Sequence, residues 1–168
     1  EWWSTPPRSM VSTTRHIPDI GPAGLVWVED GLGWERAQSK RVAIAPGRTV
    51  FEIDTAEAWA ELCRQFPLDQ TAAKRHDWYR ATGRVGRWVT PNWVHVAERY
   101  AGVHLQVAAY LAAAGTAIAI DDTTSSVIAG WDPDQTYWFS PDLAYKPDAV
   151  AWHLTAPDNQ WRADPIPY

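Results

Sequence analysis

The chain has almost no cysteine, because Cys63 is the only one in 168 residues. A single cysteine excludes an intramolecular disulfide framework and fits a reducing compartment, so we expect a cytoplasmic protein. No basic and apolar leader follows Glu1, which argues against a signal peptide. A chain of this length buries roughly two thirds of its unfolded surface, so it needs neither a disulfide nor a cofactor to fold.

Long apolar runs are also scarce. The one long run, residues 105–120, is rich in alanine, contains Gln106 and Gly115, and is short for a bilayer. We therefore expect no membrane partner and interpret the run as a buried helix, or as a helix followed by a strand. The net charge of −5 gives no general attraction to nucleic acid or to an anionic membrane.

Most catalytic signatures are missing from the sequence. There is no Gly-x-Ser-x-Gly elbow, no P-loop and no Gly-x-Gly-x-x-Gly after a strand. The five histidines are isolated, with no pair at metal-ligand spacing, so we predict no metal site. Basic residues gather between Lys74 and Arg87, where they form either a solvated face or a site for one anion such as a pyrophosphate.

The patterns that are present predict an α+β fold. Residues 54–66 begin with the capping-box form Asp-x-x-Glu and continue with apolar residues at helical spacing, which predicts a helix. Thr90-Pro91 predicts the start of a second helix that ends before Gly102. Residues 41–44 and 49–53 have the pattern of two strands around a turn. A short strand is predicted at 24–29, and short strands of one sheet are predicted at 116–120, 127–129 and 136–139.

These elements predict one domain over residues 1–168, with short mixed or antiparallel sheets that form a cleft, about three helices and long loops. Residues 1–24 predict a strand followed by a proline-rich loop, and residues 140–168 predict a proline-rich tail packed on the surface. The polar and basic stretch 68–89 is long for a plain connector, so we predict a functional loop there.

Twelve tryptophans are more than an ordinary core needs. Each ring buries about 150–250 Å² and suits places where flat rings are held or stacked. The densest polar cluster near them is 130–139, where Asp132 and Asp134 flank Pro133 beside indoles. Such a setting tunes the pKa of a carboxyl group for chemistry at a sugar hydroxyl. The alternative interpretation is an Asp-Pro-Asp turn that caps a hairpin.

The order of four elements resembles a known family. They are an aromatic-Ser-Thr strand near the start, a Gly-Leu-Val-Trp strand at 24–27, a helix-to-strand unit at 93–103 and a late strand at 130–138. This order is similar to that of bacterial and phage proteins of the ADP-ribosyltransferase-like fold. In that family a short mixed sheet binds NAD in a cleft between two half-sheets, and an acidic residue on a late strand contacts the nicotinamide ribose.

The resemblance implies an enzyme that cleaves the nicotinamide glycosidic bond of NAD and transfers ADP-ribose to an unidentified protein or nucleobase. Asp134, with Asp132 beside it, would be the catalytic carboxylate, although the family usually has the longer Glu there. The residues implied to bind NAD are Trp3, Ser4, Thr5, Arg8, Trp27, Tyr110 and Trp131. Arg15 or an arginine of the basic stretch is an alternative cation for the pyrophosphate.

Two other functions fit the same sequence. A non-catalytic binding module would use exposed tryptophans to grip a nucleotide, a sugar or a partner protein. Alternatively the tryptophans serve packing alone, which predicts that nearly all indoles are buried and that no pocket lies beside Asp134.

Overall fold

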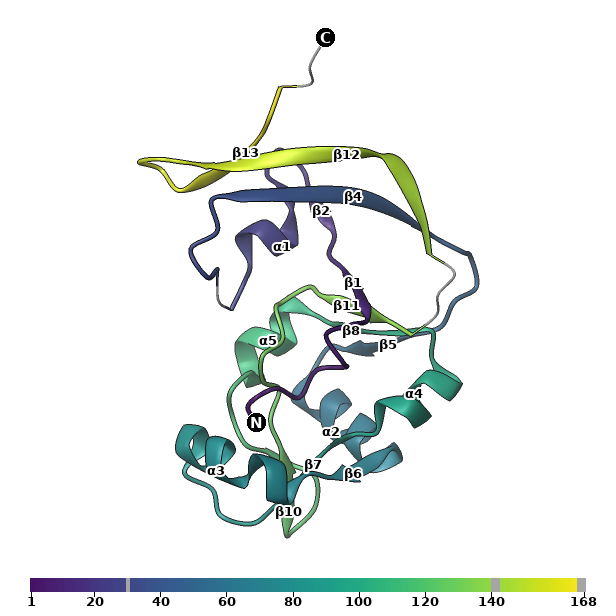
Figure 1. The fold of residues 1–168 in the computed structure, drawn as a ribbon. Coiled ribbons are helices and arrows are strands. Elements are labelled where there is room, and N and C mark those ends of the chain that lie inside the picture. The colour runs from purple at the N-terminus through teal and green to yellow at the C-terminus, as the bar shows by residue number, and fades with distance from the viewer. Residues whose placement is uncertain (30, 140–142, 166–168) are drawn as a thin grey trace.

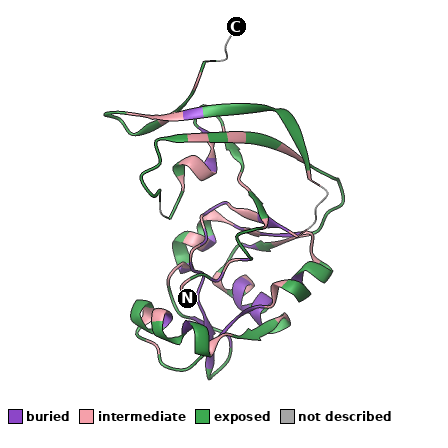
Figure 2. Ribbon diagram, in the orientation of Figure 1, coloured by how far each residue is buried: buried purple, intermediate pink, exposed green. Residues whose placement is uncertain are grey.

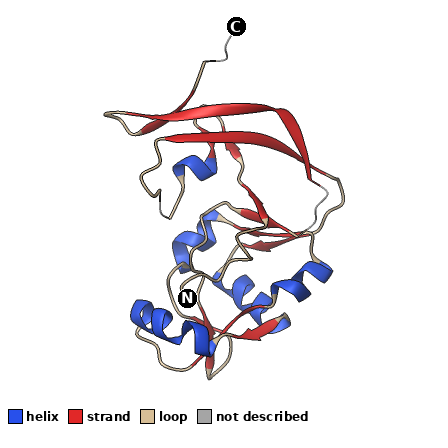
Figure 3. Cartoon of the chain, viewed as in Figure 1, coloured by secondary structure: helices blue, strands red, loops and turns tan. Residues whose placement is uncertain are grey.

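The computed structural model describes residues 1–29, 31–139 and 143–165. Five helices and several small mixed and antiparallel sheets occupy these residues, which confirms the predicted α+β class (Figure 3). None of these helices is long and apolar enough to cross a bilayer.

The central sheet has the strand order β1-β11-β8-β5, in which β5 is parallel to β8 and the other neighbours are antiparallel. In that order its strands are Val11–Thr13, Thr136–Trp138, Gly102–Leu105 and Val50–Ile53. One face of this sheet packs against α2 (Ala56–Gln65) and α5 (Val107–Ala113), because Val103, Leu105 and Ile53 belong to the same buried cluster as residues of both helices.

A second sheet lies below the central one in Figure 1 and has the order β6-β7-β10-β9. Its strands are Pro67–Asp69, Arg87–Pro91, Thr124–Ser126 and Ile118–Ala119. Helix α3 (Thr71–Thr82) contacts β7 through Trp78, whose ring lies 5.3 Å from that of Trp88. The prediction of a loop over 68–89 was therefore wrong, because this stretch forms a helix between two paired strands.

A third sheet, β13-β12-β4, forms a separate layer at the top of Figure 1. Its strands are Gln160–Ala163, Leu143–Thr155 and Arg36–Ile44. Figure 2 shows that this layer is mainly exposed, whereas buried residues gather around α2 and β7. Trp152 is buried and faces Gly21, which follows the short strand β2 (His16–Ile17) and begins β3 (Gly21–Pro22).

The third sheet corrects the prediction of a surface tail over residues 140–168. Instead, β12 and β13 form a hairpin that extends onto β4, with a register irregularity between Tyr145 and Ala149. The parts of the prediction at 140–142 and 166–168 lie outside the described residues.

The two predicted helices exist, but their starts differ from the prediction. Thr55, and not Asp54, caps α2, since its hydroxyl accepts a hydrogen bond from the Ala58 amide at 3.1 Å. Helix α4 (Trp93–Arg99) is capped by Asn92. Residues 90–91 were predicted to start this helix, but they pair with β6 as the end of β7.

Several strand predictions were half right. Residues 41–44 and 49–53 lie in β4 and β5, but these strands pair with β12 and β8 and not with each other. The strand predicted at 24–29 is wrong, because the short helix α1 (Ala23–Val26) occupies its start. The run 105–120 contains α5 followed by β9, which confirms the interpretation of a helix followed by a strand.

The remaining strand predictions fall into different sheets. Residues 116–120 and 136–139 contain β9 and β11, which belong to different sheets and not to one. Residues 127–129 make only a single bridge, between Ile128 and Ala114. In the N-terminal segment, the first strand is β1 and not the predicted aromatic strand at Trp2–Thr5.

Half of the twelve tryptophans are buried inside the molecule. Trp59, Trp78, Trp88, Trp131, Trp138 and Trp152 are buried, and Trp3 and Trp34 are the two exposed ones. Trp131 touches the rings of Trp59, Trp93 and Tyr137 at centroid distances of 6.0, 5.9 and 5.4 Å. Packing therefore accounts for much of the tryptophan content.

Candidate functional site

The acidic segment of residues 130–134 is a tight turn that leads into β11. Gly130 and Asp134 both have positive φ, at 67° and 64°. The Asp132 carboxylate accepts a hydrogen bond from the Glu29 amide at 2.7 Å, whereas Asp134 binds Arg15. The two predicted catalytic carboxylates thus hold different parts of the chain. The alternative interpretation is right about the turn but wrong about the hairpin, because β10 before the turn and β11 after it belong to different sheets.

Asp134 is 2% exposed, and both oxygens of its carboxylate accept hydrogen bonds. It accepts hydrogen bonds from the Arg15 backbone amide at 3.0 Å and from Arg15 Nε at 2.5 Å, and Arg15 Nη2 completes the ion pair. His104 Nε2 lies 3.5 Å from the same carboxylate. Burial raises the pKa of Asp134, but the hydrogen bonds and charge of Arg15 outweigh burial, so its pKa is lowered and it stays ionised.

His104 links Asp134 to a second carboxylate that sequence reasoning missed. Its Nδ1 lies 2.7 Å from Glu52 Oε2, and the Gln106 amide donates to the same oxygen at 3.1 Å. Glu52, His104, Thr136 and Thr13 are matched in register across the central sheet, so they share the face that is turned away from the core. The sequence pattern could have identified these two residues, because Glu52 and His104 are each a polar residue between two apolar core residues of a short strand.

A large cleft is lined by residues 11–16 and by residues of β4 and β12. In Figure 1 the chain runs upward from β1 in the central sheet toward the layer of β4 and β12. The volume of the cleft is about 1090 Å³, and Arg15 lines it. Arg15 also binds Asp134, but Asp134 itself is buried and does not line the cleft.

The cleft is basic. Arg15, Lys40, Arg41 and Lys146 line it, against Asp148 as the single acid among the described lining residues. Within the described part of the chain, no ion pair involves Lys40, Arg41 or Lys146. A concave surface with excess positive charge attracts anions, even on a protein whose net charge is negative.

Apart from Arg15, the alternative cation for the pyrophosphate, none of the predicted NAD-binding residues lines this cleft. Trp3 is exposed, with the Arg8 guanidinium 4.3 Å from its ring centroid and Gly130 beneath its ring. Ser4 is buried, and its hydroxyl accepts a hydrogen bond from the Ala129 amide at 2.9 Å. These residues thus tie the N-terminal segment to the turn before β11.

The other predicted binding residues lie near that same turn. Thr5 forms a hydrogen bond with Tyr137, and Trp131 is fully buried. Tyr110 lies close enough to Glu29 and Asp132 that burial first, and then these two carboxylates, raise its pKa. Trp27 is half-buried in the segment after α1.

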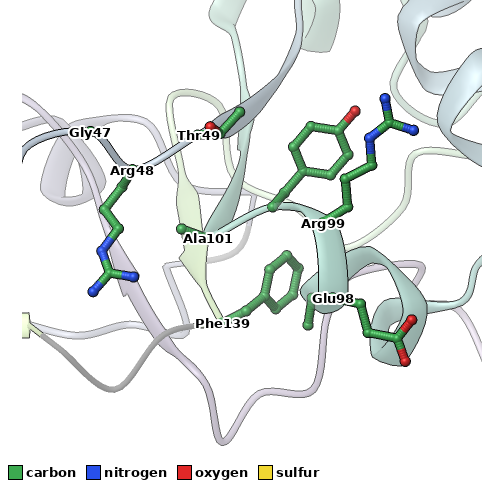
Figure 4. Close-up of a pocket in the computed structure, with 9 residues that line it drawn as sticks. Gly47, Arg48, Thr49, Glu98, Arg99, Ala101 and Phe139 are labelled. Carbon is green, nitrogen blue, oxygen red and sulfur yellow. The ribbon is translucent and has the colours of Figure 1, made fainter.

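A smaller pocket of about 390 Å³ lies between the start of β5 and the end of α4. Arg48, Glu98 and Arg99 line it, and Figure 4 shows their charged groups pointing away from one another. Because these charges do not converge, the basic cleft is the better candidate site.

The described residues contain no group of three His, Cys, Asp or Glu side chains that could hold a metal ion. Burial raises the pKa of Cys63 to about 12, so this thiol is not a nucleophile at neutral pH.

Comparison with protein-family models, with curated proteins and with solved structures found no match to this chain. The residues and the geometry of the cleft therefore carry the functional argument by themselves.

Proposed function

We propose that the chain is a binding module for a phosphate-bearing small molecule of the nucleotide class, held in the basic cleft. The observation that carries this proposal is the gathering of Lys40, Arg41 and Lys146, without ion-pair partners among the described residues, in a cleft of about 1090 Å³. That volume is slightly above the usual range of about 300–1,000 Å³ for small-molecule sites.

The chemistry of the lining fits each part of a nucleotide. The cations would bind phosphate oxygens by charge-assisted hydrogen bonds. The exposed ring of Tyr145 offers a face on which a base would stack. The hydroxyls of Ser12 and Thr13 offer partners for a ribose.

Titration calorimetry with ADP tests this function. We expect the double variant Lys40→Glu and Lys146→Glu to bind ADP at least about tenfold more weakly, because each reversal removes a charge-assisted contact and adds repulsion. The matched control, Arg75→Glu with Arg80→Glu on α3, changes the net charge equally outside the cleft and should bind like the wild type. Equal affinity of all three proteins, or no binding of ADP, would refute the proposal.

A second candidate function is NAD-dependent ADP-ribosyl transfer. The observation that favours it is that Arg15 lines the cleft while holding Asp134, on the sheet face that also presents the half-exposed Glu52. In this function the pyrophosphate of NAD would bind Arg15, and a carboxylate would stabilise the positive charge that develops on the ribose as the glycosidic bond breaks.

Release of nicotinamide from NAD tests the transferase function. We expect slow release by the wild-type protein, a loss of at least about a hundredfold in Asp134→Asn, and unchanged release in Asp158→Asn, which alters an exposed carboxylate of the β12–β13 hairpin. Glu52→Gln separates the two acids, since loss of release only in that variant would move the catalytic role to Glu52. A protein that binds ADP but releases no nicotinamide would be a binding module without this activity.

A further inference from the structure

Strand β4 is an edge strand of the third sheet. It pairs with β12 on one side only, and among the described elements no other strand or helix packs extensively along it. None of its nine residues is buried. An edge strand presents a row of backbone amides and carbonyls that can pair with a further strand.

The register of the third sheet shows which backbone groups of β4 are free. The Leu154 amide donates a hydrogen bond to the Glu35 carbonyl at 2.9 Å, and these two residues continue the register of β12 and β4. Because hydrogen-bonded pairs alternate along antiparallel strands, every second residue from Glu35 onward directs its backbone groups toward β12. The amides and carbonyls of Arg36, Gln38 and Lys40 therefore point away from β12, and no hydrogen bond within the described part of the chain uses them.

This free edge borders the basic cleft. Gln38, Lys40 and Arg41 line the cleft, and so does β1, which is an edge strand of the central sheet. Neighbouring strands of a sheet lie about 5 Å apart, so an extended chain in the cleft lies close enough to β4 for backbone pairing. The cleft therefore has the geometry that the addition of one strand requires.

The charges along this edge select an acidic strand. Lys40 and Arg41 are exposed and form no ion pair with a described residue. Arg36 already pairs with Asp164 at 3.7 Å, and the neighbouring Glu35 is exposed, so that end of β4 has no excess of positive charge. The unpaired cations are concentrated at Lys40 and Arg41, where acidic side chains of an added strand would be favourable neighbours.

A second copy of β4 fits this edge less well. When residues 36, 38 and 40 of two copies pair with one another, cationic side chains become direct or diagonal neighbours in every antiparallel register. The register that brings Glu35 opposite Arg41 of the other copy also brings Arg36 opposite Lys40. An acidic strand meets no such repulsion.

We propose that an acidic, extended segment of another protein adds to the free edge of β4, with its carboxylates beside Lys40 and Arg41. Lys146 and Asp148, which also line the cleft, have opposite charges and leave this preference unchanged. The segment is a ligand beyond the nucleotide of the proposed function and binds independently of it. Because both ligands would use Lys40, each would weaken the binding of the other by the same factor.

Fluorescence anisotropy with a labelled peptide of about seven residues tests the pairing. The peptide has two adjacent central glutamates, flanked by threonine and valine, because adjacent residues of a strand project to opposite faces as Lys40 and Arg41 do. We expect it to bind at least about tenfold more tightly than the same peptide with lysine in place of glutamate.

A proline variant tests the role of the backbone. Gln38→Pro removes an outward amide that the fold does not use, and it should bind the acidic peptide at least about tenfold more weakly. The matched control, Gln38→Ala, keeps the amide and should bind like the wild type. Circular dichroism shows whether both variants are folded.

A charge reversal tests the preference for acidic segments independently of the proline variant. Lys40→Glu with Arg41→Glu should lose the acidic peptide and bind the lysine peptide at least about tenfold more tightly than the wild type does. No binding of the acidic peptide by the wild type, equal binding by the wild type and folded Gln38→Pro, or an unchanged preference after charge reversal would each overturn the proposal.

Sedimentation velocity and titration with ADP separate the remaining occupants of the cleft. Self-association of the wild type that Gln38→Pro abolishes would overturn the proposal and identify a second copy as the partner. Binding of the acidic peptide without binding of ADP would support the added strand and refute the proposed function. Binding of ADP without binding of the peptide would overturn the added strand alone.

Discussion

Replacing Trp131 with alanine should destabilise the protein by about 4 kcal/mol, which is large against the total stability of a domain of this size. The side chain is fully buried and contacts the rings of Trp59, Trp93 and Tyr137. The alanine variant loses the free energy gained by burying a large ring. It also leaves a cavity that the rigid neighbouring rings cannot fill. Urea unfolding followed by far-ultraviolet circular dichroism measures the difference.

The matched control is Trp34→Ala, which removes the same side chain from an exposed position just before β4. We expect the free energy of unfolding of this variant to stay within about 0.5 kcal/mol of the wild type, since Trp34 is outside both buried clusters. Equal losses in the two variants would contradict the assignment of Trp131 to the core and of Trp34 to the surface.

The sequence correctly predicted those elements in which the capping residues and the apolar spacing match the face that is buried in the fold. Helix α2 has a capping hydroxyl at Thr55 and a buried stripe that includes Trp59 and Leu62, so the capping signal and the apolar periodicity together located it. Helix α3 was missed because its buried positions include Lys74, whose ammonium group binds the Trp3 carbonyl at 2.5 Å. A lysine on the buried face hides the amphipathic pattern on which such a prediction depends.

The cleft could not be predicted from the sequence, because distant strands create it. Residues of β4 pair with residues of β12 about a hundred positions later, and prolines in that region indicated a tail. Pro147 lies at the register irregularity between Tyr145 and Ala149. The regular hydrogen bonds between β12 and β4 are interrupted there, so the missing amide donor of proline costs no strand-pairing hydrogen bond. The acidic turn at Asp132 and Asp134 was located correctly as a motif, but its partner Arg15 lies 119 residues away and only the fold brings it there.

Substituting Asp134 with asparagine should lower the free energy of unfolding by about 2 kcal/mol at pH 7. Asparagine keeps the size of the side chain and tolerates φ of 64°, so the change removes the charge without straining the turn. The loss is smaller than for a fully buried ion pair because Arg15, once unpaired, is more than half exposed and regains water.

The pH dependence of that loss identifies its cause. The pKa of Asp134 is lower in the folded protein than its usual value, so the wild-type carboxylate contributes its full stability above about pH 5. As the pH falls through the folded pKa, the carboxylate becomes protonated and this contribution is lost, so the difference in stability between the two proteins should shrink. Other carboxylates titrate alike in both proteins and cancel from the difference. A difference that is constant from pH 7 to pH 2 would mean that asparagine disturbs packing instead of the ion pair with Arg15.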